Sequence, residues 1–399
     1  LRDAPATLWL LLGEAQSKIE HVANIPLQPA VHERFNKVYL AKGALATTAI
    51  EGNTLSEDEA IARVEGRLEL SPSREYLGKE LDNVLAALNS IWDDETGEFD
   101  VLTPALIHRF NRTILDGLSV EPGVVPGECR HHSVGVARYR AAPHEDCDFL
   151  LEQLCQWLRG PQFEAAQGEQ KTAIAIIKAV LAHLYIAWIH PYGDGNGRTA
   201  RLVEFEILAQ AGVPMSSAHL LSNHYNATRT EYYRQLDAAS RSGGDVIPFL
   251  VYAVRGLVDG LREQLRHVMA QQWNAVWRDF IHENLSMTPS RTNLRRRALV
   301  FALSDQPPKA TVSRSRLPFL TPEIMAAYQG KTGKTLARDL NYLQEISLVR
   351  RDSRDAGFAA NKRAMVAFRP RRKRKKPTPV SSAPKASGST NIGTIKKEK

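Results

Sequence analysis

Apolar side chains recur every three or four residues along most of the chain, the spacing that gathers them on one face of an α-helix. One stretch, residues 171–189, is apolar on nearly every face, so we expect it to lie buried at the centre of the fold. A single short segment, Ser133–Tyr139, reads as extended chain between turn-forming glycines and prolines. The pattern therefore predicts a mainly α protein, with helices over residues 30–50, 80–92, 104–118, 148–158, 171–189 and 199–210.

A second group of elements follows the helices predicted within residues 247–285. It comprises three helices and then two strand-like segments, an order typical of a winged helix-turn-helix unit. From Arg369 onward the chain is rich in Pro, Ser, Gly and Lys and lacks apolar periodicity, which predicts a disordered tail. The predicted elements of this second group are helices at 290–303, 322–328 and 334–346 and strands at 348–351 and 364–368.

Composition narrows the class of protein. The 399 residues are 43% hydrophobic and 24% charged, as in an ordinary soluble globular protein, which excludes a wholly disordered chain and a collagen-like repeat. The net charge is +8, but residues 369–399 hold eleven Lys or Arg and one acidic residue, a net +10. The rest of the chain is therefore nearly neutral, and the basic tail favours either salt-sensitive attraction to nucleic acid or a solvated end.

The number of cysteines and the hydropathy of the chain indicate in which cellular compartment we expect the protein. Cys129, Cys147 and Cys155 are too few for a disulfide framework, and their spacing matches no zinc pattern, so we expect reduced thiols in a cytoplasmic protein. No uninterrupted apolar stretch reaches the ~18 residues that span a bilayer. Leu8–Leu12 lacks the flanks of a signal peptide, so we expect no membrane association.

Two further motifs are set aside. GKTGKT at residues 330–335 invites comparison with a phosphate-binding P-loop, but the pattern needs a glycine five residues earlier, where the chain has Met325 and Tyr328. We interpret it as the turn into the third helix of the winged unit. The histidines at 131–132, and His144 beside two acids, lack the geometry of a metal site and favour a polar surface role.

The segment that carries chemistry is HPYGDGNGRTAR, residues 190–201, between two predicted helices. Its glycines let the backbone aim several N–H groups into one concavity, to which the helix beginning near Arg198 adds its positive end. Arg198 and Arg201 stand one helical turn apart, so both guanidiniums can reach one polyphosphate. The loop is thus predicted to bind phosphates through Gly193, Gly195, Gly197, Arg198 and Arg201.

Three other side chains of this loop indicate a reaction. Asp194 offers a hard oxygen ligand for Mg²⁺, which commonly keeps several waters and one or two carboxylates beside substrate phosphates. His190, with an ordinary pKa of about 6.5, is suited to accepting the proton of a hydroxyl. Asn196 offers an amide donor to a phosphate oxygen. A base, a metal ligand and an anion site on one loop indicate nucleotide-dependent transfer onto a hydroxyl.

This loop resembles the signature of the Fic family, HPFx(D/E)GNGRxxR, and departs from it only at Tyr192, where the family has Phe. The resemblance implies a Fic helical fold with a short β-hairpin flap and a reaction that uses ATP and Mg²⁺. His190 would deprotonate a Ser, Thr or Tyr hydroxyl of a target protein, which attacks the α-phosphate, so that AMP is transferred and pyrophosphate leaves. The resemblance implies that Asp194 holds Mg²⁺, that Asn196, Gly195 and Gly197 bind the α-phosphate, and that Arg198 and Arg201 bind the outer phosphates.

Two segments outside the loop extend the resemblance. Residues 126–143, PGECRHHSVGVARYRAAP, are similar to the flap that aligns the target, whose family form often reads PGxYR; Cys129 replaces the aromatic residue. Tyr232 and Tyr233 resemble the family's adenine-side tyrosines, although the Asn that commonly follows them is Ser240 here. Core packing is the alternative interpretation of these tyrosines.

The segment TTAIEGN, residues 47–53, fits the family's inhibitory motif (S/T)xxxE(G/N) with Thr47, Glu51 and Gly52. The resemblance implies that Glu51 pairs with Arg201 and places negative charge where the γ-phosphate must bind. An exposed glutamate at a helix end is the alternative.

Together these resemblances divide the chain into five parts. They are an N-terminal helical region with the inhibitory motif (1–95), a Fic catalytic core (96–250), connecting helices (251–286), a winged helix-turn-helix unit (287–368) and the basic tail (369–399).

The leading hypothesis is a cytoplasmic protein adenylyltransferase, a nucleotidyltransferase held inactive by Glu51. The same site could instead remove AMP, with Glu51 positioning a water, or transfer UMP or a phosphate. A hypothesis of another class is a DNA-binding regulator whose loop senses nucleotide without turnover. The expected partners are a hydroxyl-bearing target protein, the chain itself through self-modification, a second copy in a homodimer, and nucleic acid at the winged unit and tail.

Overall fold

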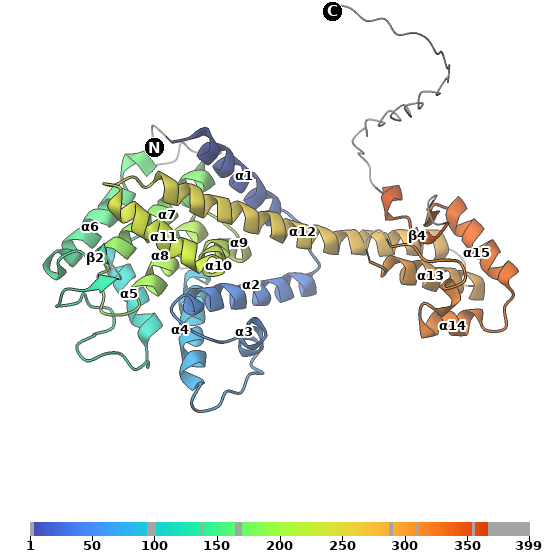
Figure 1. Cartoon of the computed structure of the whole chain (residues 1–399), viewed down its shortest axis with the longest axis horizontal. Coiled ribbons are helices and arrows are strands. Elements are labelled where there is room, and N and C mark those ends of the chain that lie inside the picture. Colours follow the sequence, from blue (N-terminus) through green and yellow to red (C-terminus); the bar gives the residue numbers. More distant parts are fainter. Residues whose placement is uncertain are drawn as a thin grey trace, which may run out of the picture. The chain divides into compact units, whose positions relative to one another are not determined.

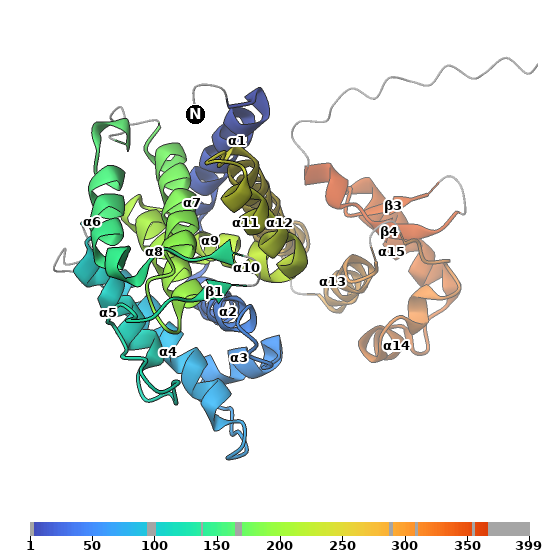
Figure 2. The same ribbon diagram turned by 60° about the vertical axis from the view of Figure 1, so that its left-hand side comes forward.

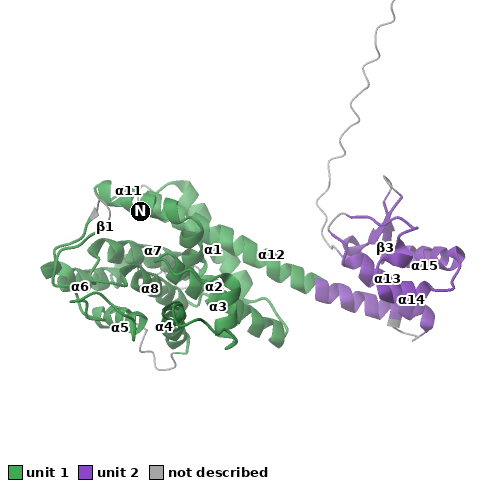
Figure 3. Ribbon diagram, turned by 60° about the horizontal axis from the view of Figure 1, so that its bottom comes forward, with its two compact units in different colours: residues 1–273 green, residues 274–399 purple. Residues whose placement is uncertain are grey.

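The computed structural model describes residues 4–93, 101–136, 139–163, 170–286, 290–307, 310–352 and 356–365. The chain divides into two compact units, residues 1–273 and 274–399, with the boundary inside helix α12 (Ile247–Ser286) (Figure 3). Residues on both sides of the boundary predicted at 95–96 contribute to one hydrophobic core in unit 1. The predicted tail, 369–399, lies outside the described residues.

Unit 1 is a helical bundle with one small hairpin (Figure 1). The hairpin pairs β1 (Gly135–Val136) with β2 (Tyr139–Arg140) in antiparallel register. It falls within the predicted flap, so the segment predicted as one extended piece contains residues of two paired strands; residues 137–138 lie outside the described part. The helices are α1 (Ala6–Ala23), α2 (Pro29–Ala49), α3 (Glu57–Val64), α4 (Glu75–Trp92), α5 (Pro104–Leu115), α6 (Cys147–Leu158), α7 (Lys171–Ile189), α8 (Asn196–Gln210), α9 (Met215–Ala218), α10 (Leu220–Ala227) and α11 (Arg229–Arg241), with 3-10 turns at His144–Asp146 and Pro161–Phe163.

Helix α7 is the centre of unit 1, as its all-round apolar pattern predicts. It packs against α8 and lies between α6 and α1 (Figure 2). Among the described residues, it is the one helix long and apolar enough to cross a membrane, and 61% of that stretch is buried within the protein. The burial accounts for the composition, because a helix covered on all sides needs no polar face.

Unit 2 joins the end of α12 to α13 (Arg291–Ser304), α14 (Pro322–Tyr328), α15 (Gly333–Glu345) and the antiparallel strands β3 (Val349–Arg351) and β4 (Phe358–Ala360), with 3-10 turns at Leu317–Phe319 and Lys362–Met365. Residues 330–332 connect α14 to α15 and follow no strand. Asp339 of α15 is buried, and its carboxylate accepts bonds at 2.8 Å from Nε of Arg295 and of Arg296. Three helices followed by two strands match the predicted order, while the winged-helix assignment stays a prediction.

The strand predicted at 364–368 is wrong for its described part, residues 364–365. Strand β4 lies at Phe358–Ala360, within the stretch predicted as a connecting segment, because Phe358 pairs with Arg351 and also forms a bridge to Val312. The described part of the predicted strand belongs to a 3-10 turn, in which the Ala364 amide donates to the Asn361 carbonyl at 2.8 Å. The helices predicted within 247–285 form one continuous helix, α12.

Candidate active site

The loop of residues 190–195 connects α7 to α8 and turns the chain within a few residues. His190 ends α7 in the left-handed region, with φ 50° and ψ 57°. Gly195, with φ 78°, precedes the first residue of α8, so that helix begins earlier than predicted. A Cβ atom on Gly195 would lie 2.9 Å from Nδ2 of Asn111, so glycine is required there both for its φ and for the space.

Two asparagines hold the loop in shape. Asn196 bonds both polar atoms of the Tyr192 main chain, accepting from its N–H at 2.9 Å and donating to its carbonyl at 2.8 Å. Asn111 of α5 is fully buried; its Nδ2 donates to the Asp194 carbonyl at 2.9 Å and its Oδ1 accepts from the Gly127 N–H at 2.9 Å. The Asn196 amide predicted to contact phosphate therefore supports the loop itself.

Arg130 ties the predicted flap to the same loop. Its side chain is buried, and its Nε donates to the carbonyl of His190 at 2.9 Å. Its own N–H donates to the carbonyl of Pro191 at 2.9 Å, and its terminal nitrogens donate to the carbonyls of His132 and Ala142. The guanidinium thus joins both ends of the hairpin segment to the residue predicted to be the base.

The burial of His190 favours its neutral form. Burial lowers the pKa of its imidazole below the ordinary value, against a hydrogen bond to the Ala187 carbonyl that acts in the opposite direction. A neutral imidazole can accept a proton, so the side chain is in the state that a general base requires.

Arg198 lies between two carboxylates. Its Nη1 is 3.0 Å from Oε1 of Glu80 and its Nη2 is 2.9 Å from Oδ1 of Asp194. The other oxygen of Glu80 accepts a bond at 3.0 Å from Asn53, whose amide also donates to the Leu77 carbonyl at 2.9 Å. Asn53, two residues after Glu51, therefore connects the predicted inhibitory segment to the partner of Arg198.

Arg201 has unused donors. Its side chain is fully buried, and Nη2 donates to Oε1 of Glu51 at 2.6 Å and to the Thr47 carbonyl at 2.9 Å. Its Nε and Nη1 have no hydrogen-bond partner among the described residues. A buried guanidinium with open donors is a ready site for an anion such as a phosphate.

Glu51 follows α2 and precedes Gly52, whose φ of 111° turns the chain away from the helix. Its side chain is 34% exposed, and its Oε1 lies so close to Gly197 that a Cβ atom there would collide with it. Burial opposes ionisation of this carboxyl, but the nearby guanidinium of Arg201 outweighs that effect and holds the pKa of Glu51 below its ordinary value. A negative charge therefore sits over the first turn of α8, where the sequence predicts phosphate.

The remaining predicted residues divide between surface and core. Asp194 is 46% exposed and its Oδ1 also accepts the Gly195 N–H at 2.5 Å, which leaves its other oxygen for a hard cation. Tyr232 is buried, with its hydroxyl 2.8 Å from Nε2 of His183. Tyr233 is 41% exposed, and its hydroxyl donates to the Ile50 carbonyl at 3.4 Å. Of the two tyrosines, Tyr233 has the accessible ring.

Sequence reasoning missed Asn111, Arg130 and Glu80. Asn111 carried a signal, because it is the polar residue on the apolar face of α5 formed by Leu106, Ile107, Phe110 and Ile114. Arg130 also carried a signal, because it matches the arginine of the flap pattern PGxYR. Glu80 carried none, since a charged residue on a helix is ordinarily solvated.

Part of the chain is similar to known proteins. Residues 101–208 match the model of the Fic/DOC family. Protein adenylyltransferase fic-1 of Caenorhabditis briggsae is 32% identical over 218 residues, which cover 52% of this chain and 38% of the relative. Protein adenylyltransferase Fic of Nematostella vectensis is 28% identical over 238 residues, covering 58% and 49%. The chain thus spans less than half the length of these curated relatives.

Solved structures show the fold. A Fic family protein from Desulfovibrio desulfuricans superposes with a TM-score of 0.53 at 21% identity, covering 89% of this chain and 96% of that one. Residues 134–508 of Fic-1 from Caenorhabditis elegans give a TM-score of 0.53 at 24% identity, covering 67% and 74%. The mainly α architecture described above is therefore a Fic fold.

Proposed function

We propose that this chain, which carries a Fic domain over residues 101–208, is a protein adenylyltransferase that uses ATP to modify a hydroxyl of a target protein. The observation that carries the proposal is the set of side chains in one segment, residues 190–201, which comprises the loop and the start of α8. It brings together the neutral imidazole of His190, the half-exposed carboxylate of Asp194 and the buried guanidinium of Arg201 with two open donors. The names of the relatives support the same chemistry.

The reaction follows from these positions. The imidazole of His190 accepts the proton of the target hydroxyl, whose oxygen forms a bond to the α-phosphorus. The bond from that phosphorus to the bridging oxygen breaks, and pyrophosphate leaves with the electron pair. The first turn of α8 directs its N–H groups at the phosphate charge, and Arg201 binds the outer phosphates. Asp194 would hold Mg²⁺, which neutralises phosphate charge when bound.

Glu51 is proposed to inhibit the reaction. Its carboxylate uses the Nη2 donor of Arg201 and lies against Gly197, so the outer phosphates of ATP meet a negative charge instead of a free guanidinium. Release of this residue from Arg201 would open the site. Removal of AMP is the second candidate, because an ionised carboxylate inside the site can also orient a water.

The winged unit is proposed as a docking module. Arg295 and Arg296 are engaged with Asp339, whereas Lys331, Lys334 and Arg338 are exposed. These three cations would meet either DNA phosphates or an acidic protein surface.

The test is intact-mass spectrometry of the purified chain after incubation with ATP and Mg²⁺. We expect the mass of one AMP on Glu51→Gly, little on the unmodified chain, and none on the double variant Glu51→Gly/His190→Ala. Parallel reactions with a cell lysate use ATP labelled at the α- or the γ-phosphate. Label from the α position alone supports AMP transfer, label from the γ position indicates phosphoryl transfer, and no label with any variant contradicts the proposal.

A further inference from the structure

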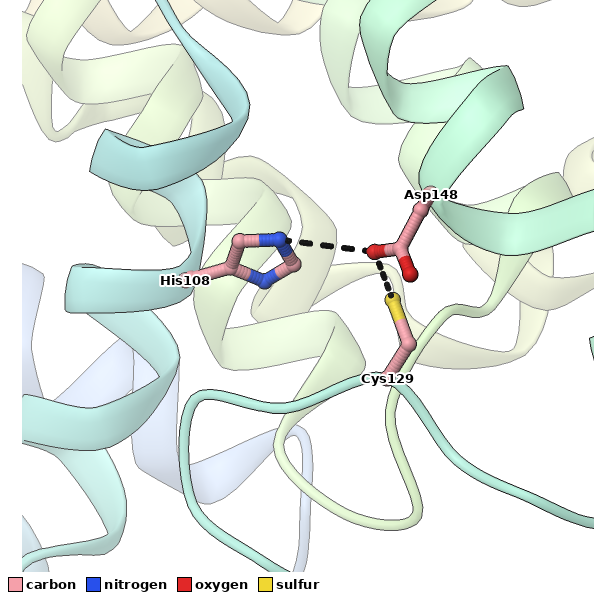
Figure 4. Close-up of side chains that lie close together, drawn as sticks. All are labelled: His108, Cys129 and Asp148. Carbon is pink, nitrogen blue, oxygen red and sulfur yellow. Dashed lines mark hydrogen bonds and ion pairs between the residues drawn. The ribbon is translucent and has the colours of Figure 1, made fainter.

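Three potential metal ligands from separate segments lie close together (Figure 4). His108 lies on α5, Cys129 in the loop before β1, and Asp148 in the first turn of α6. Nε2 of His108 is 3.7 Å from Oδ1 of Asp148, and Sγ of Cys129 is 3.1 Å from the same oxygen. All three ligand atoms lie within 4.8 Å of one another.

These separations fit a tetrahedral zinc ion. Zinc bonds of about 2.3 Å to sulfur and about 2.0–2.2 Å to nitrogen and oxygen place neighbouring ligand atoms about 3.3–3.6 Å apart at the tetrahedral angle. The separations of 3.7 Å between Nε2 and Oδ1 and of 3.1 Å between Sγ and Oδ1 bracket that range, and Nε2 lies within 4.8 Å of Sγ, so small side-chain shifts suffice. A thiolate, an imidazole and one carboxylate are a donor set suited to zinc and unsuited to magnesium, which prefers oxygen ligands alone.

The ring of His108 is oriented by Tyr192, which lies on the side away from Asp148. Its Nδ1 is 3.0 Å from the hydroxyl of Tyr192, and the two rings meet edge to face. Protein zinc sites use such a contact to fix which nitrogen faces the metal. Because Nδ1 is engaged with Tyr192, Nε2 is the nitrogen that faces Asp148. The side chain of Asp148 is 77% exposed, which gives an ion a path from solvent and leaves room for a water as fourth ligand.

Two departures from the Fic sequence pattern coincide here. Cys129 stands where the flap pattern has an aromatic residue, and Tyr192 stands where the loop signature has Phe. An aromatic ring at position 129 would supply no thiolate. Phe at position 192 would have no hydroxyl to form the hydrogen bond with Nδ1 of His108. Both changes supply a group that a metal site needs, one as ligand and the other as support, and they are joined through His108.

We propose that Nε2 of His108, Sγ of Cys129 and the carboxylate of Asp148 bind one Zn²⁺ ion, with water as the fourth ligand. The ion fastens the start of the hairpin segment to α5 and α6. Arg130, the next residue, bonds the carbonyls of His190 and Pro191, so the zinc-bound segment also supports the active-site loop. Sequence reasoning could not find this site, because the three ligands come from distant segments and form no local motif.

The test is metal binding by the full chain after removal of metal with a chelator. Zn²⁺ is titrated in competition with a chromophoric chelator, and Co²⁺ is used as a spectroscopic substitute. We expect one tight equivalent per chain and a thiolate-to-cobalt charge-transfer band with the intense visible bands of tetrahedral Co²⁺. Weak binding without the thiolate band would overturn the proposal.

Single substitutions identify which residues bind the zinc ion. We expect Cys129→Ser to abolish the thiolate band and weaken zinc binding by at least about 100-fold, and Tyr192→Phe to weaken it about 10- to 100-fold. Cys155→Ser, a buried cysteine outside the cluster, and His131→Ala, an exposed histidine, are the matched controls and should bind as the unmodified chain does. Equal affinity of Cys129→Ser and the unmodified chain refutes the site.

A folding control keeps the result interpretable. Circular dichroism and thermal melting without metal are recorded for each variant. If Cys129→Ser does not fold, Asp148→Asn gives the answer, because its side chain is largely exposed and its replacement should leave the fold intact. Zinc should raise the melting temperature of the unmodified chain and not that of Asp148→Asn. An equal rise in both would count against the site.

Discussion

Replacing Glu51 by Gln removes the charge that faces Arg201 and keeps the size of the side chain. The carboxylate lies 2.6 Å from a guanidinium that is fully buried, and it is itself 34% exposed. A hydrogen bond between charged groups contributes about 1.5–3 kcal/mol. ATP must break the hydrogen bond between Glu51 and Arg201 before its phosphates can bind the guanidinium. Each 1.4 kcal/mol of that energy lowers the affinity for ATP tenfold. We therefore expect ATP to bind the Glu51→Gln variant about 10- to 150-fold more tightly than it binds the chain that retains Glu51.

The assay is calorimetric titration of ATP and Mg²⁺ into chains that also carry His190→Ala, so that no turnover occurs. The matched control is Glu33→Gln, an exposed glutamate of α2 that pairs with Lys37. A second readout is thermal melting, because loss of Glu51 leaves a buried cation short of one partner at a cost of about 1–3 kcal/mol. The melting temperature should fall by roughly 2–10 °C without ATP and recover with it. ATP affinities within threefold of each other for Glu51→Gln and Glu33→Gln would refute the reasoning.

Three further outcomes follow from the structure. Because burial lowers the pKa of His190, its neutral form persists to lower pH, so modification by the activated Glu51 variant should fall to half its maximal rate at a pH below 6.5; a half-maximal rate at or above pH 6.5 would contradict this. Gly195→Ala should cost about 1–3 kcal/mol more than Gly212→Ala in denaturant unfolding, since both have positive φ but only at the first would a Cβ crowd Asn111; equal losses would exclude the clash. Asp339→Asn should lower the unfolding free energy of unit 2 by about 1–3 kcal/mol, measured as a shift of its transition alone, and a shift confined to unit 1 would show that the assignment is wrong.

Local pattern was sufficient for the central helices and the loop between them. Helix α7 runs from Lys171 to Ile189, as predicted, because a continuous apolar stretch ends there at a polar, glycine-rich segment. The loop of residues 190–201 carries most of its candidate chemistry within one turn and one helix start, so spacing alone placed those groups together.

Tertiary partners could not be predicted in the same way. Periodicity shows which face of a helix is buried and does not show what packs against it, so the contacts of Asn111, Arg130 and Glu80 with the loop stayed hidden. Strand β4 was misplaced for a similar reason, since its position depends on the bridge from Phe358 to Val312. The buried ring of Tyr232 likewise depends on His183, which lies on a different helix.

Asn53 links the acidic partner of Arg198 to the chain segment that carries the acidic partner of Arg201. Its amide bonds Glu80, the partner of Arg198, while its main chain lies two residues from Glu51, the partner of Arg201. The partners of the two arginines are therefore joined by a short stretch of main chain, so we expect a movement that frees one arginine to disturb the other. Opening of the site should be cooperative, so the effects of removing Glu51 and Glu80 on ATP affinity should be non-additive in a double-mutant cycle.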